Sequence, residues 1–406
     1  MSQQLLERLT RRGITPGLER IRGLLARLDH PERAFRIVLV GGTNGKGSTA
    51  RALARILQVA GERVGLFTSP HLLDVRERIE VDGVAIERTS FDAGLARIEP
   101  LLEAVDASYF EALTALALLH FAELGVTTAV LEVGLGGRFD AVNATDPVLS
   151  IVTNVTLDHT DWLGPTLAHV AREKAGILRP GRPALTAATG EGARFLAAAA
   201  RARGVRLQRV SATHVEAHGY GVAFALDGGV YAAPLMGRHQ AANLALAVRA
   251  ARKLGADGAA LRAGLAAVRH PGRLEYRAAE RLLLDGAHNP AGARALARAL
   301  ADYFPGSPKI LVCAASRDKD VSGMAAALAP AFEAVWLTRY PDARAADPAA
   351  LARFFPQARI EPDPHAALER ALQARPPGGL VVVAGSLYLL GALMRQSAGL
   401  SVDPSR

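Results

Sequence analysis

Short apolar runs alternate with amphipathic stretches along most of the chain. In the first half, apolar runs of strand length occupy residues 36–40, 64–68, 129–133 and 149–153, and helical patterns occupy residues 48–60 and 109–124. Strands that alternate with helices in this way build a parallel sheet covered by helices. The pattern therefore predicts an α/β fold for this half of the chain.

A second alternation follows after a change of pattern. Residues 205–235 consist of short apolar runs with glycine-rich turns, which predicts an edge layer of hairpins, and a long helix is expected at 239–253. Further strands are expected at 281–284, 310–314, 334–337 and 380–384, with helices at 290–303 and from about Pro364. Because HPGR at residues 270–273 breaks the helical pattern, we predict two α/β domains, 1–270 and 271–406, with ligand sites between them at strand C-terminal ends.

The composition narrows the class of protein. The chain has 406 residues, of which 50% are hydrophobic, and this size excludes a single small binding module. A formal net charge of +9 is compatible with a polyanionic partner, but the arginines are interspersed with alanine, leucine and glutamate. We therefore expect no nucleic acid partner. Only five of the 48 basic residues are lysine, so each lysine is a candidate for chemistry that arginine cannot perform.

The cysteine content and the N-terminus predict the compartment. Cys313 is the single cysteine, which excludes an intrachain disulfide and favours a reducing environment. The N-terminal MSQQLLERLTRR lacks the apolar core of a signal peptide, and the apolar stretch at residues 113–122 is too short to span a membrane. We expect a cytoplasmic protein with no membrane partner.

The strongest local motif is VLVGGTNGKGSTARALARIL, in which a strand leads into a glycine-rich turn and then a helix. Backbone amides of the turn, the helix N-terminus and Lys46 would together bind the phosphates of a nucleotide. In the Walker pattern, a residue with a hydroxyl group follows the lysine directly. Here Gly47 follows Lys46 and the hydroxyl comes one position later, on Ser48, so this is a variant phosphate loop. The candidate nucleotide-binding residues are Gly42, Thr43, Asn44, Gly45, Lys46, Gly47 and Ser48. A glycine-rich turn without a ligand is the alternative.

Carboxylates after two other strands are candidates for a metal site. Glu132 ends a buried strand, where it could reach a magnesium ion on the nucleotide phosphates or form an ordinary salt bridge. Asp158, His159 and Asp161 follow the next strand. Because Mg²⁺ prefers oxygen ligands, His159 alone is a weak ligand candidate, and the two aspartates could instead cap the following turn.

Lys174 lies in a predicted helix within AREKAGILRPG. It could be a solvated lysine paired with a carboxylate. Alternatively, its neutral amine could add carbon dioxide and become a carbamate, an anionic oxygen ligand that arginine cannot mimic. That chemistry requires a lowered pKa or capture of the carbamate by a cation.

The second predicted domain carries its own polar cluster. Arg273 in HPGRLE and Asp285, His288 and Asn289 in DGAHNP could supply a phosphate-binding cation and polar groups at a strand end. Asn289 could equally cap a helix that begins at Pro290. Asn243, on the helix before the boundary, could contact an adenine edge or bond only within its helix.

Taken together, these segments resemble one family. In chain order, the motifs that carry the resemblance are GTNGKGS, TSPHL, SYFEALTALAL, LEVGLGGRFDAVN, LDHTDWLG, REKAGI, HPGRLE, DGAHNP and GSLYL. They resemble the folylpolyglutamate synthase/dihydrofolate synthase family of the Mur ligase superfamily, from about residue 18 to residue 390. The resemblance implies a phosphate-loop ATPase domain followed by a smaller, Rossmann-like C-terminal α/β domain, with ATP between them.

The resemblance also implies roles for single residues. Ser48, Ser69, Glu132 and His159 would serve magnesium, Lys46 would hold the phosphates, and Lys174 matches a carbamylated lysine. Asn243, Arg273 and Asp285 match nucleotide-contacting positions, and we add Asn289 to this group. His288 and Ser386 lie in motifs that face the reaction centre and the incoming glutamate, and the segment ITPGLERI resembles one that helps bind a pterin.

The implied reaction joins L-glutamate to the carboxylate of dihydropteroate or a reduced folate, with ATP and Mg²⁺, through an acyl phosphate. The expected catalytic residues are Lys46, Lys174 and His288. The expected partners are these small molecules, and the protein is expected to be a monomer; the sequence leaves a monovalent cation requirement open. The alternatives are another Mur-type amino-acid ligase and a phosphate-loop switch that acts on a protein or nucleic acid.

Overall fold

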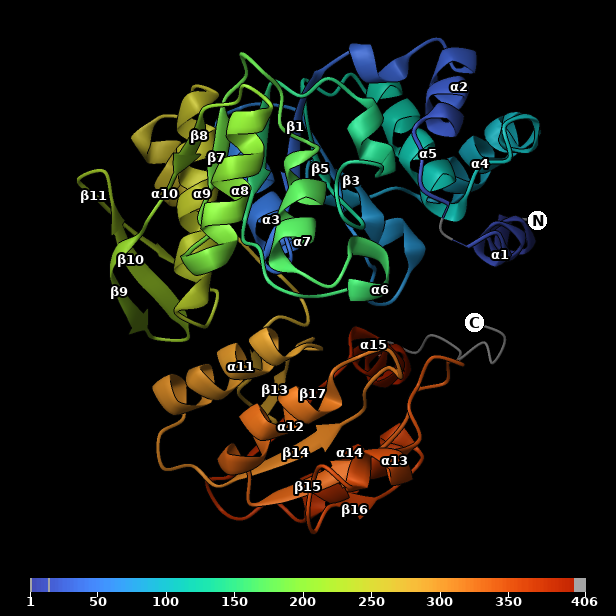
Figure 1. Ribbon diagram of the computed structural model, residues 1–406. Coiled ribbons are helices and arrows are strands. Elements are labelled where there is room, and N and C mark those ends of the chain that lie inside the picture. Colours follow the sequence, from blue (N-terminus) through green and yellow to red (C-terminus); the bar gives the residue numbers. More distant parts are fainter. Residues whose placement is uncertain (1, 14, 398–406) are drawn as a thin grey trace. The chain divides into compact units, whose positions relative to one another are not determined.

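The computed structural model describes residues 2–13 and 15–397 (Figure 1). The chain divides into two compact units. The first contains Met1–Thr213, Leu226–Tyr231 and Ala242–Val268, and the second contains His214–Ala225, Ala232–Ala241 and Arg269–Arg406. Within the described ranges, no helix is both long enough and apolar enough to cross a membrane.

The first unit is built on an eight-stranded sheet, counted over the described residues, with the order β4-β3-β2-β5-β1-β6-β7-β8. In chain order, the strands are β1 (Arg36–Gly41), β2 (Val64–Phe67), β3 (Ile79–Val81), β4 (Val84–Ala85), β5 (Thr128–Glu132), β6 (Leu149–Val152), β7 (Ala184–Thr186) and β8 (Leu207–Arg209). Within this sheet, the neighbouring strands β2, β5, β1, β6, β7 and β8 pair in parallel, as predicted. Strands β3 and β4 add an antiparallel edge beside β2.

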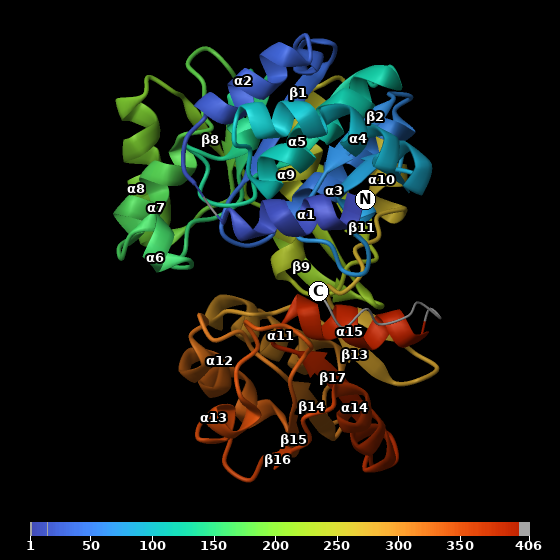
Figure 2. The ribbon, with the colours of Figure 1, turned by 90° about the vertical axis from the view of Figure 1, so that its right-hand side faces the viewer.

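Helices cover both faces of this sheet (Figures 1 and 2). They are α1 (Ser2–Arg11), α2 (Glu19–Arg27), α3 (Lys46–Val59), α4 (Arg88–Ala104), α5 (Tyr109–Glu123), α6 (Thr160–Leu163), α7 (Leu167–Ala175), α8 (Gly190–Ala202), α9 (His239–Lys253) and α10 (Gly258–Ala266), with 3₁₀ turns η1 (Pro31–Arg33), η2 (Val75–Arg78) and η3 (Ala141–Ala144). The side chains of α2, α4, α5, α7 and α8 form one apolar cluster with Ile37, Leu39 and Leu131 of the central strands. Helix α10 packs directly on α3, because a Cβ atom on Gly264 would lie 2.6 Å from Ile56 Cα.

The second unit contains a six-stranded sheet, again counted over the described residues, with the order β12-β13-β17-β14-β15-β16. Its strands are β12 (Glu275–Arg277), β13 (Leu282–Leu284), β14 (Lys309–Cys313), β15 (Ala334–Leu337), β16 (Arg359–Ile360) and β17 (Leu380–Ala384). Its helical segments are α11 (Pro290–Tyr303), α12 (Val321–Leu328), η4 (Ala329–Ala331), α13 (Pro348–Ala352), α14 (Pro364–Gln373) and α15 (Leu387–Ser397). All strand pairs are parallel except β12 with β13.

The segment at 205–235 departs from the expected edge layer. Strand β8 joins the large sheet beside β7, and β9 (Thr213–His218), β10 (Gly221–Leu226) and β11 (Gly229–Ala233) form a separate three-stranded sheet. A second difference is that α3 begins at Lys46, two residues before the expected start. The left-handed Gly45 precedes it, so the helix N-terminus lies directly on the glycine-rich turn.

Candidate active site

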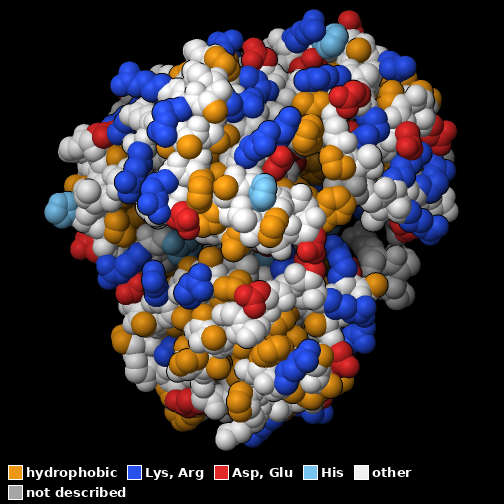
Figure 3. Space-filling view, in the orientation of Figure 1, with side chains coloured by type: hydrophobic (Ala, Val, Ile, Leu, Met, Phe, Trp, Pro, Cys, Tyr) orange, Lys and Arg blue, Asp and Glu red, His pale blue; other side chains and the backbone are white. Residues whose placement is uncertain are grey.

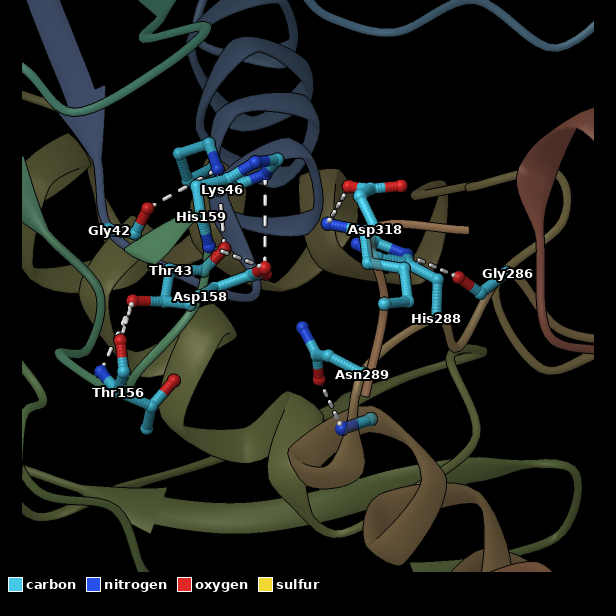
Figure 4. Close-up of polar contacts among 12 residues, drawn as sticks. Gly42, Thr43, Lys46, Thr156, Asp158, His159, Gly286, His288, Asn289 and Asp318 are labelled. Atoms are coloured by element: carbon cyan, nitrogen blue, oxygen red, sulfur yellow. Dashed lines mark hydrogen bonds and ion pairs between the residues drawn. The ribbon is translucent and has the colours of Figure 1, made fainter. Parts of the chain in front are cut away.

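The phosphate-loop motif forms the turn between β1 and α3. Gly42 has φ +139°, and a Cβ atom there would overlap the Thr153 hydroxyl, so the turn requires glycine at this position. The Lys46 ammonium group donates to the carbonyl oxygens of Gly42 and Thr43 at 3.2 and 3.3 Å, as Figure 4 shows. The loop therefore holds its lysine at the N-terminus of a helix, the arrangement that binds phosphates.

Residues after β6 brace this loop from the side. Asn154 accepts from the Asn44 backbone N–H at 3.0 Å through Oδ1 and donates to the Asn44 carbonyl at 2.9 Å through Nδ2. The Thr43 hydroxyl donates to the Thr156 carbonyl at 3.0 Å. Asn154 was not among the predicted site residues, although the scarcity of asparagine in the chain was a signal that could have found it.

Asn243 of α9 lies beside the same loop. A Cβ atom on Gly45 would overlap the Asn243 side chain, and the Asn243 carbonyl accepts from the Thr49 hydroxyl at 3.3 Å. Asn243 is 6% exposed. The structure thus brings this residue to the loop from nearly 200 positions later in the sequence.

Two predicted magnesium residues meet at the ends of neighbouring strands. Glu132 is buried, lies opposite Val40 in the pairing of β5 with β1, and accepts from the Ser69 backbone N–H at 3.1 Å. Ser48 is buried in the first turn of α3. In the described part of the chain, no three His, Cys, Asp or Glu side chains gather as a metal cluster. Any ion here would therefore depend on hydroxyls and ligand phosphates as well as Glu132.

His159 lies on the left-handed residue that precedes α6. Its φ is +50°, its side chain is 41% exposed, and its Nε2 atom lies 3.9 Å from Asp158 Oδ1 (Figure 4). The His159 backbone N–H donates to the same Asp158 oxygen at 2.9 Å. Asp158 therefore orients His159 locally.

Lys174 is buried on α7, with 2% of the residue exposed. Burial, followed by the positive charge of Lys46, lowers the pKa of Lys174 to about 7, whereas Asp158 and Glu173 act in the opposite direction. The charges of Asp158 and Glu173 therefore act on an amine that is shielded from solvent. This burial contradicts the alternative of a solvated lysine.

The glycine-rich loop after β5 packs against the backbone of Lys174. A Cβ atom on Gly137 would lie 2.9 Å from the Glu173 carbonyl oxygen and 3.3 Å from Lys174 Cα. Gly176 has the same constraint, because a side chain there would overlap Arg138. Only small residues allow these two segments to approach so closely.

Asp140 anchors this loop and was missed by sequence reasoning. Its carboxylate accepts from the backbone N–H groups of Leu135 and Val142 at 2.9 and 3.2 Å. Burial raises the pKa of Asp140 to about 7, against the effect of its backbone donors and of Lys46. The signal in the sequence was an aspartate directly before a short helical turn, which is a common capping position.

In the second unit, Asp285 ties two motifs together. It follows β13, is 8% exposed, and accepts from the backbone N–H groups of Leu274 and Ala287, both at 2.9 Å. Arg273 donates to the Gly286 carbonyl at 3.3 Å. Burial raises the pKa of Asp285, and the Arg273 charge opposes that rise. HPGRLE and DGAHNP thus form one local structure.

His288 and Asn289 have defined partners in this structure (Figure 4). His288 Nδ1 lies 2.8 Å from the Gly286 carbonyl oxygen, so Nδ1 carries the proton and Nε2 is the acceptor of the neutral ring. Asn289 Oδ1 accepts from the Gly292 N–H at 2.8 Å and caps α11, with Pro290 in the first turn. The capping alternative is therefore confirmed for Asn289, and nucleotide contact stays a prediction.

Ser386 lies between β17 and α15 and is 2% exposed. Its hydroxyl accepts from the Tyr388 N–H at 3.1 Å and hydrogen-bonds the Tyr340 side chain. The predicted pterin segment is described only in part, because Ile14 lies outside the described residues. In its later portion, Arg20 donates to Glu111 at 3.2 Å.

Comparison with known proteins identifies the family. Residues 40–251 match the Mur ligase middle domain, and residues 272–387 match the Mur ligase glutamate ligase domain. A dihydrofolate synthase/folylpolyglutamate synthase of Mycobacterium tuberculosis is 38% identical over 378 residues, which cover 84% of this chain and 77% of the relative. The chain belongs to the folylpolyglutamate synthase/dihydrofolate synthase family of Mur ligases. The predicted α/β Mur-ligase fold is thereby confirmed.

Other members of the folylpolyglutamate synthase/dihydrofolate synthase family match over different lengths. A probable bifunctional folylpolyglutamate synthase/dihydropteroate synthase of Haloferax volcanii is 38% identical over 94% of this chain, but the match covers 48% of that relative. The chain therefore spans about half the length of the first curated relatives it matches.

Solved structures of the folylpolyglutamate synthase/dihydrofolate synthase family match nearly the whole chain. Escherichia coli FolC in complex with DHPP and ADP is 31% identical with a TM-score of 0.90, covering 98% of this chain and 97% of that one. A bifunctional folylpolyglutamate synthase/dihydrofolate synthase of Yersinia pestis with AMPPNP and a Mn ion is 32% identical with a TM-score of 0.86, covering 97% and 96%.

Proposed function

We propose that this protein is an ATP-dependent ligase that adds L-glutamate to the carboxylate of a reduced folate, and also to dihydropteroate. One observation carries the proposal. The phosphate loop with Lys46 and the buried Glu132 lie at the C-terminal ends of the neighbouring strands β1 and β5, and the charge of Lys46 acts on the buried amine of Lys174. The family relatives bound to nucleotide and to DHPP support this substrate class.

The chain's own groups would carry out the binding steps. Lys46 and the amides at the start of α3 bind the outer phosphates of ATP, and Asn243, beside Gly45, contacts the nucleotide. In the second unit, Arg273, Asp285 and Asn289 are the proposed nucleotide contacts. Transfer of the γ-phosphate to the acceptor carboxylate then gives an acyl phosphate, which an enclosed site protects from water.

The proposed divalent cation site uses Ser48, Ser69, Glu132 and His159. The donor chemistry fits Mg²⁺, because three of the four supply oxygen and Glu132 is a buried carboxylate at a strand end. When bound, the ion neutralises charge on the transferring phosphoryl group. Ser69 orients Glu132 by donating its backbone N–H.

We propose that Lys174 is carbamylated in the active protein. With a pKa of about 7, about half of this amine is neutral at neutral pH, compared with about 0.04% for an ordinary lysine with a pKa near 10.4. The neutral amine can attack carbon dioxide and lose a proton to give an anionic carbamate. That anion would face the charge of Lys46, which turns an unfavourable pair of cations into a favourable ion pair.

The second half-reaction needs a neutral glutamate amine. His288 is suited to accept its proton, because the bond from Nδ1 to Gly286 leaves Nε2 as the basic atom. Ser386 contacts the incoming glutamate in this proposal. The amine attacks the acyl carbon, an amide bond forms, and phosphate leaves.

We further propose that residues 1–270 form the ATP-binding domain and residues 271–406 the glutamate-ligase domain, in a cytoplasmic monomer. The family matches at 40–251 and 272–387 support this division. On the face shown in Figure 3, Lys and Arg side chains are interspersed with Asp and Glu. This distribution supports small anionic substrates as partners.

An assay of ADP release tests the proposal. The protein is incubated with ATP, Mg²⁺ and L-glutamate, with dihydropteroate, with tetrahydrofolate or with neither acceptor, each in the presence and absence of potassium. We expect ADP release that depends on both L-glutamate and a pterin. Release that ignores the pterin would contradict the ligase, and the acceptor pattern decides whether one or both are used.

A further inference from the structure

The second unit contains a pocket that none of the family motifs explains. It has a volume of about 440 Å³ and is lined by the segment after β15, by the first turn of α14 with the two residues before it, and by Ala392 and Arg395 of α15. This volume lies in the range of small-molecule sites in proteins. Ser386, His288 and the other predicted site residues do not line it.

The wall of the pocket is mainly apolar. It contains Tyr340 and the three prolines Pro341, Pro362 and Pro364, with Ala392 from α15. Pro341 and Pro362 are exposed and present rings with few hydrogen-bonding groups, so they suit an apolar ligand body, and Tyr340, 1% exposed, lies behind them. The Tyr340 hydroxyl is already engaged, at 2.6 Å from the Ser316 hydroxyl.

The charged groups around the pocket are predominantly basic. Arg339, His365 and Arg395 line it, and among the described residues the side chains of Arg339 and His365 have no hydrogen-bond or ion-pair partner. The one lining carboxylate, Asp363, accepts from the Ala366 N–H at 2.8 Å and caps α14. Because Arg339 lacks an internal anion, its planar guanidinium is available for a ligand carboxylate.

One wall residue links the pocket to the proposed glutamate site. The Tyr340 side chain hydrogen-bonds Ser386, and its ring lies 5.6 Å from the ring of Tyr388. Tyr388 in turn lies under the Arg344 guanidinium group, 4.3 Å from ring centroid to Cζ. A ligand that displaces Tyr340 would therefore change the surroundings of Ser386.

We propose that this pocket is a second ligand site, which binds a small molecule with a flat apolar body and a carboxylate paired with Arg339. We further infer that its occupancy changes the affinity for L-glutamate through Tyr340 and Ser386. The first statement is independent of the proposed ligase activity, and the second rests on it.

Binding is measured on the whole protein by saturation-transfer NMR titration with benzoate, benzamide and inorganic phosphate as probes. We expect benzoate to bind in preference to both others, because benzamide lacks the charge and phosphate lacks the apolar body. In Arg339→Gln, benzoate should bind about tenfold more weakly, as expected for loss of one charge-assisted pair. Arg298→Gln, an exposed arginine on α11, is the matched control and should leave binding unchanged.

Equal benzoate affinity in wild type and Arg339→Gln would overturn the proposed site, and so would equal binding of benzoate and benzamide. If the protein bound phosphate as tightly as benzoate, the proposed contact between the apolar wall and the ligand body would be overturned. For the coupling, saturating benzoate should change the KM for L-glutamate at least twofold in wild type but not in Arg339→Gln, with the KM for ATP constant. An unchanged KM for L-glutamate would overturn the coupling while leaving the binding result intact.

Discussion

The positive charge of Lys46 acts on the amine of Lys174, and after burial it is the next largest cause that lowers the pKa of Lys174 to about 7. The two residues come from different elements, Lys46 from the start of α3 and Lys174 from the end of α7. A buried lysine near a second cation is unfavourable unless it loses its charge. Their relationship therefore favours chemistry that consumes the proton and charge of Lys174.

Lys174→Arg should abolish most ligase activity, because a guanidinium cannot form a carbamate. We expect turnover to fall at least 100-fold, which is within the range for loss of one catalytic group. Because a buried arginine could also disturb packing, Lys174→Ala is the second variant, and acetate should restore part of its activity by supplying an anionic oxygen. Lys253→Arg on α9 is the control. Near-normal turnover of Lys174→Arg would contradict the carbamate.

The stability of the protein should depend on pH in a way that identifies Lys174. The folded-state pKa of about 7 lies below the ordinary value of 10.5, so between these values the unfolded chain holds a proton that the folded chain lacks. Burial of the charged Lys174 amine therefore lowers the free energy of unfolding by its full amount below pH 7, and this loss of stability decreases as pH rises toward 10.5.

Urea unfolding in buffer free of carbon dioxide tests this sign. Lys174→Met removes the titrating amine and should therefore have a higher free energy of unfolding than wild type at pH 7. This difference between the variant and wild type should shrink as pH rises from about 7 to about 10. A difference that stays constant across this window would mean that the amine titrates normally in the folded protein.

Gly42→Ala tests the geometry of the phosphate loop. The new methyl group would overlap the Thr153 hydroxyl at a φ of +139°, so the turn must move and ATP affinity should fall at least tenfold. Gly61→Ala is matched, because Gly61 also has a positive φ, +90°, but its Cβ position has nothing within 4 Å. Titration with a fluorescent ATP analogue measures both. Similar losses in the two variants would show that backbone strain alone is responsible.

The sequence predicts much of the fold because its local signals agree with the final structure. Helix α11 begins and ends as expected, since Asn289 and Pro290 provide its cap and first turn. Strands β15 and β17 also match to the residue, because each is an apolar run between turns. The short antiparallel pair β3 and β4 was not predicted, since strands of three and two residues carry too little periodicity.

The site was predicted in residue type but not in environment. The burial of Lys174 depends on the approach of Gly137 and Gly176 to neighbouring segments, and such tertiary contacts leave no local pattern. Asp140 was missed because it holds its loop through backbone N–H groups, which every residue has. The pocket around Arg339 was not foreseen either, because its lining comes from three separate segments.

Asn289 allows a structural role to be separated from a binding role. Asn289→Ala should cost about 1 kcal/mol of stability, because the cap of α11 is lost. Asn289→Ser retains a capping oxygen and should recover most of that stability, yet its KM for ATP should rise severalfold if the amide contacts the nucleotide. Thermal unfolding and steady-state kinetics measure the two effects. A wild-type KM in Asn289→Ser would limit Asn289 to capping.

In the proposed reaction, this protein activates a pterin-linked carboxylate as an acyl phosphate before glutamate attacks it. The most direct measurement uses a tetrahydrofolate acceptor whose terminal carboxylate carries a heavy isotope of oxygen, with mass spectrometry of both products. We expect a pterin extended by one glutamyl residue and one labelled oxygen in the released phosphate. Unlabelled phosphate, or an acceptor that gains no glutamate, would contradict it.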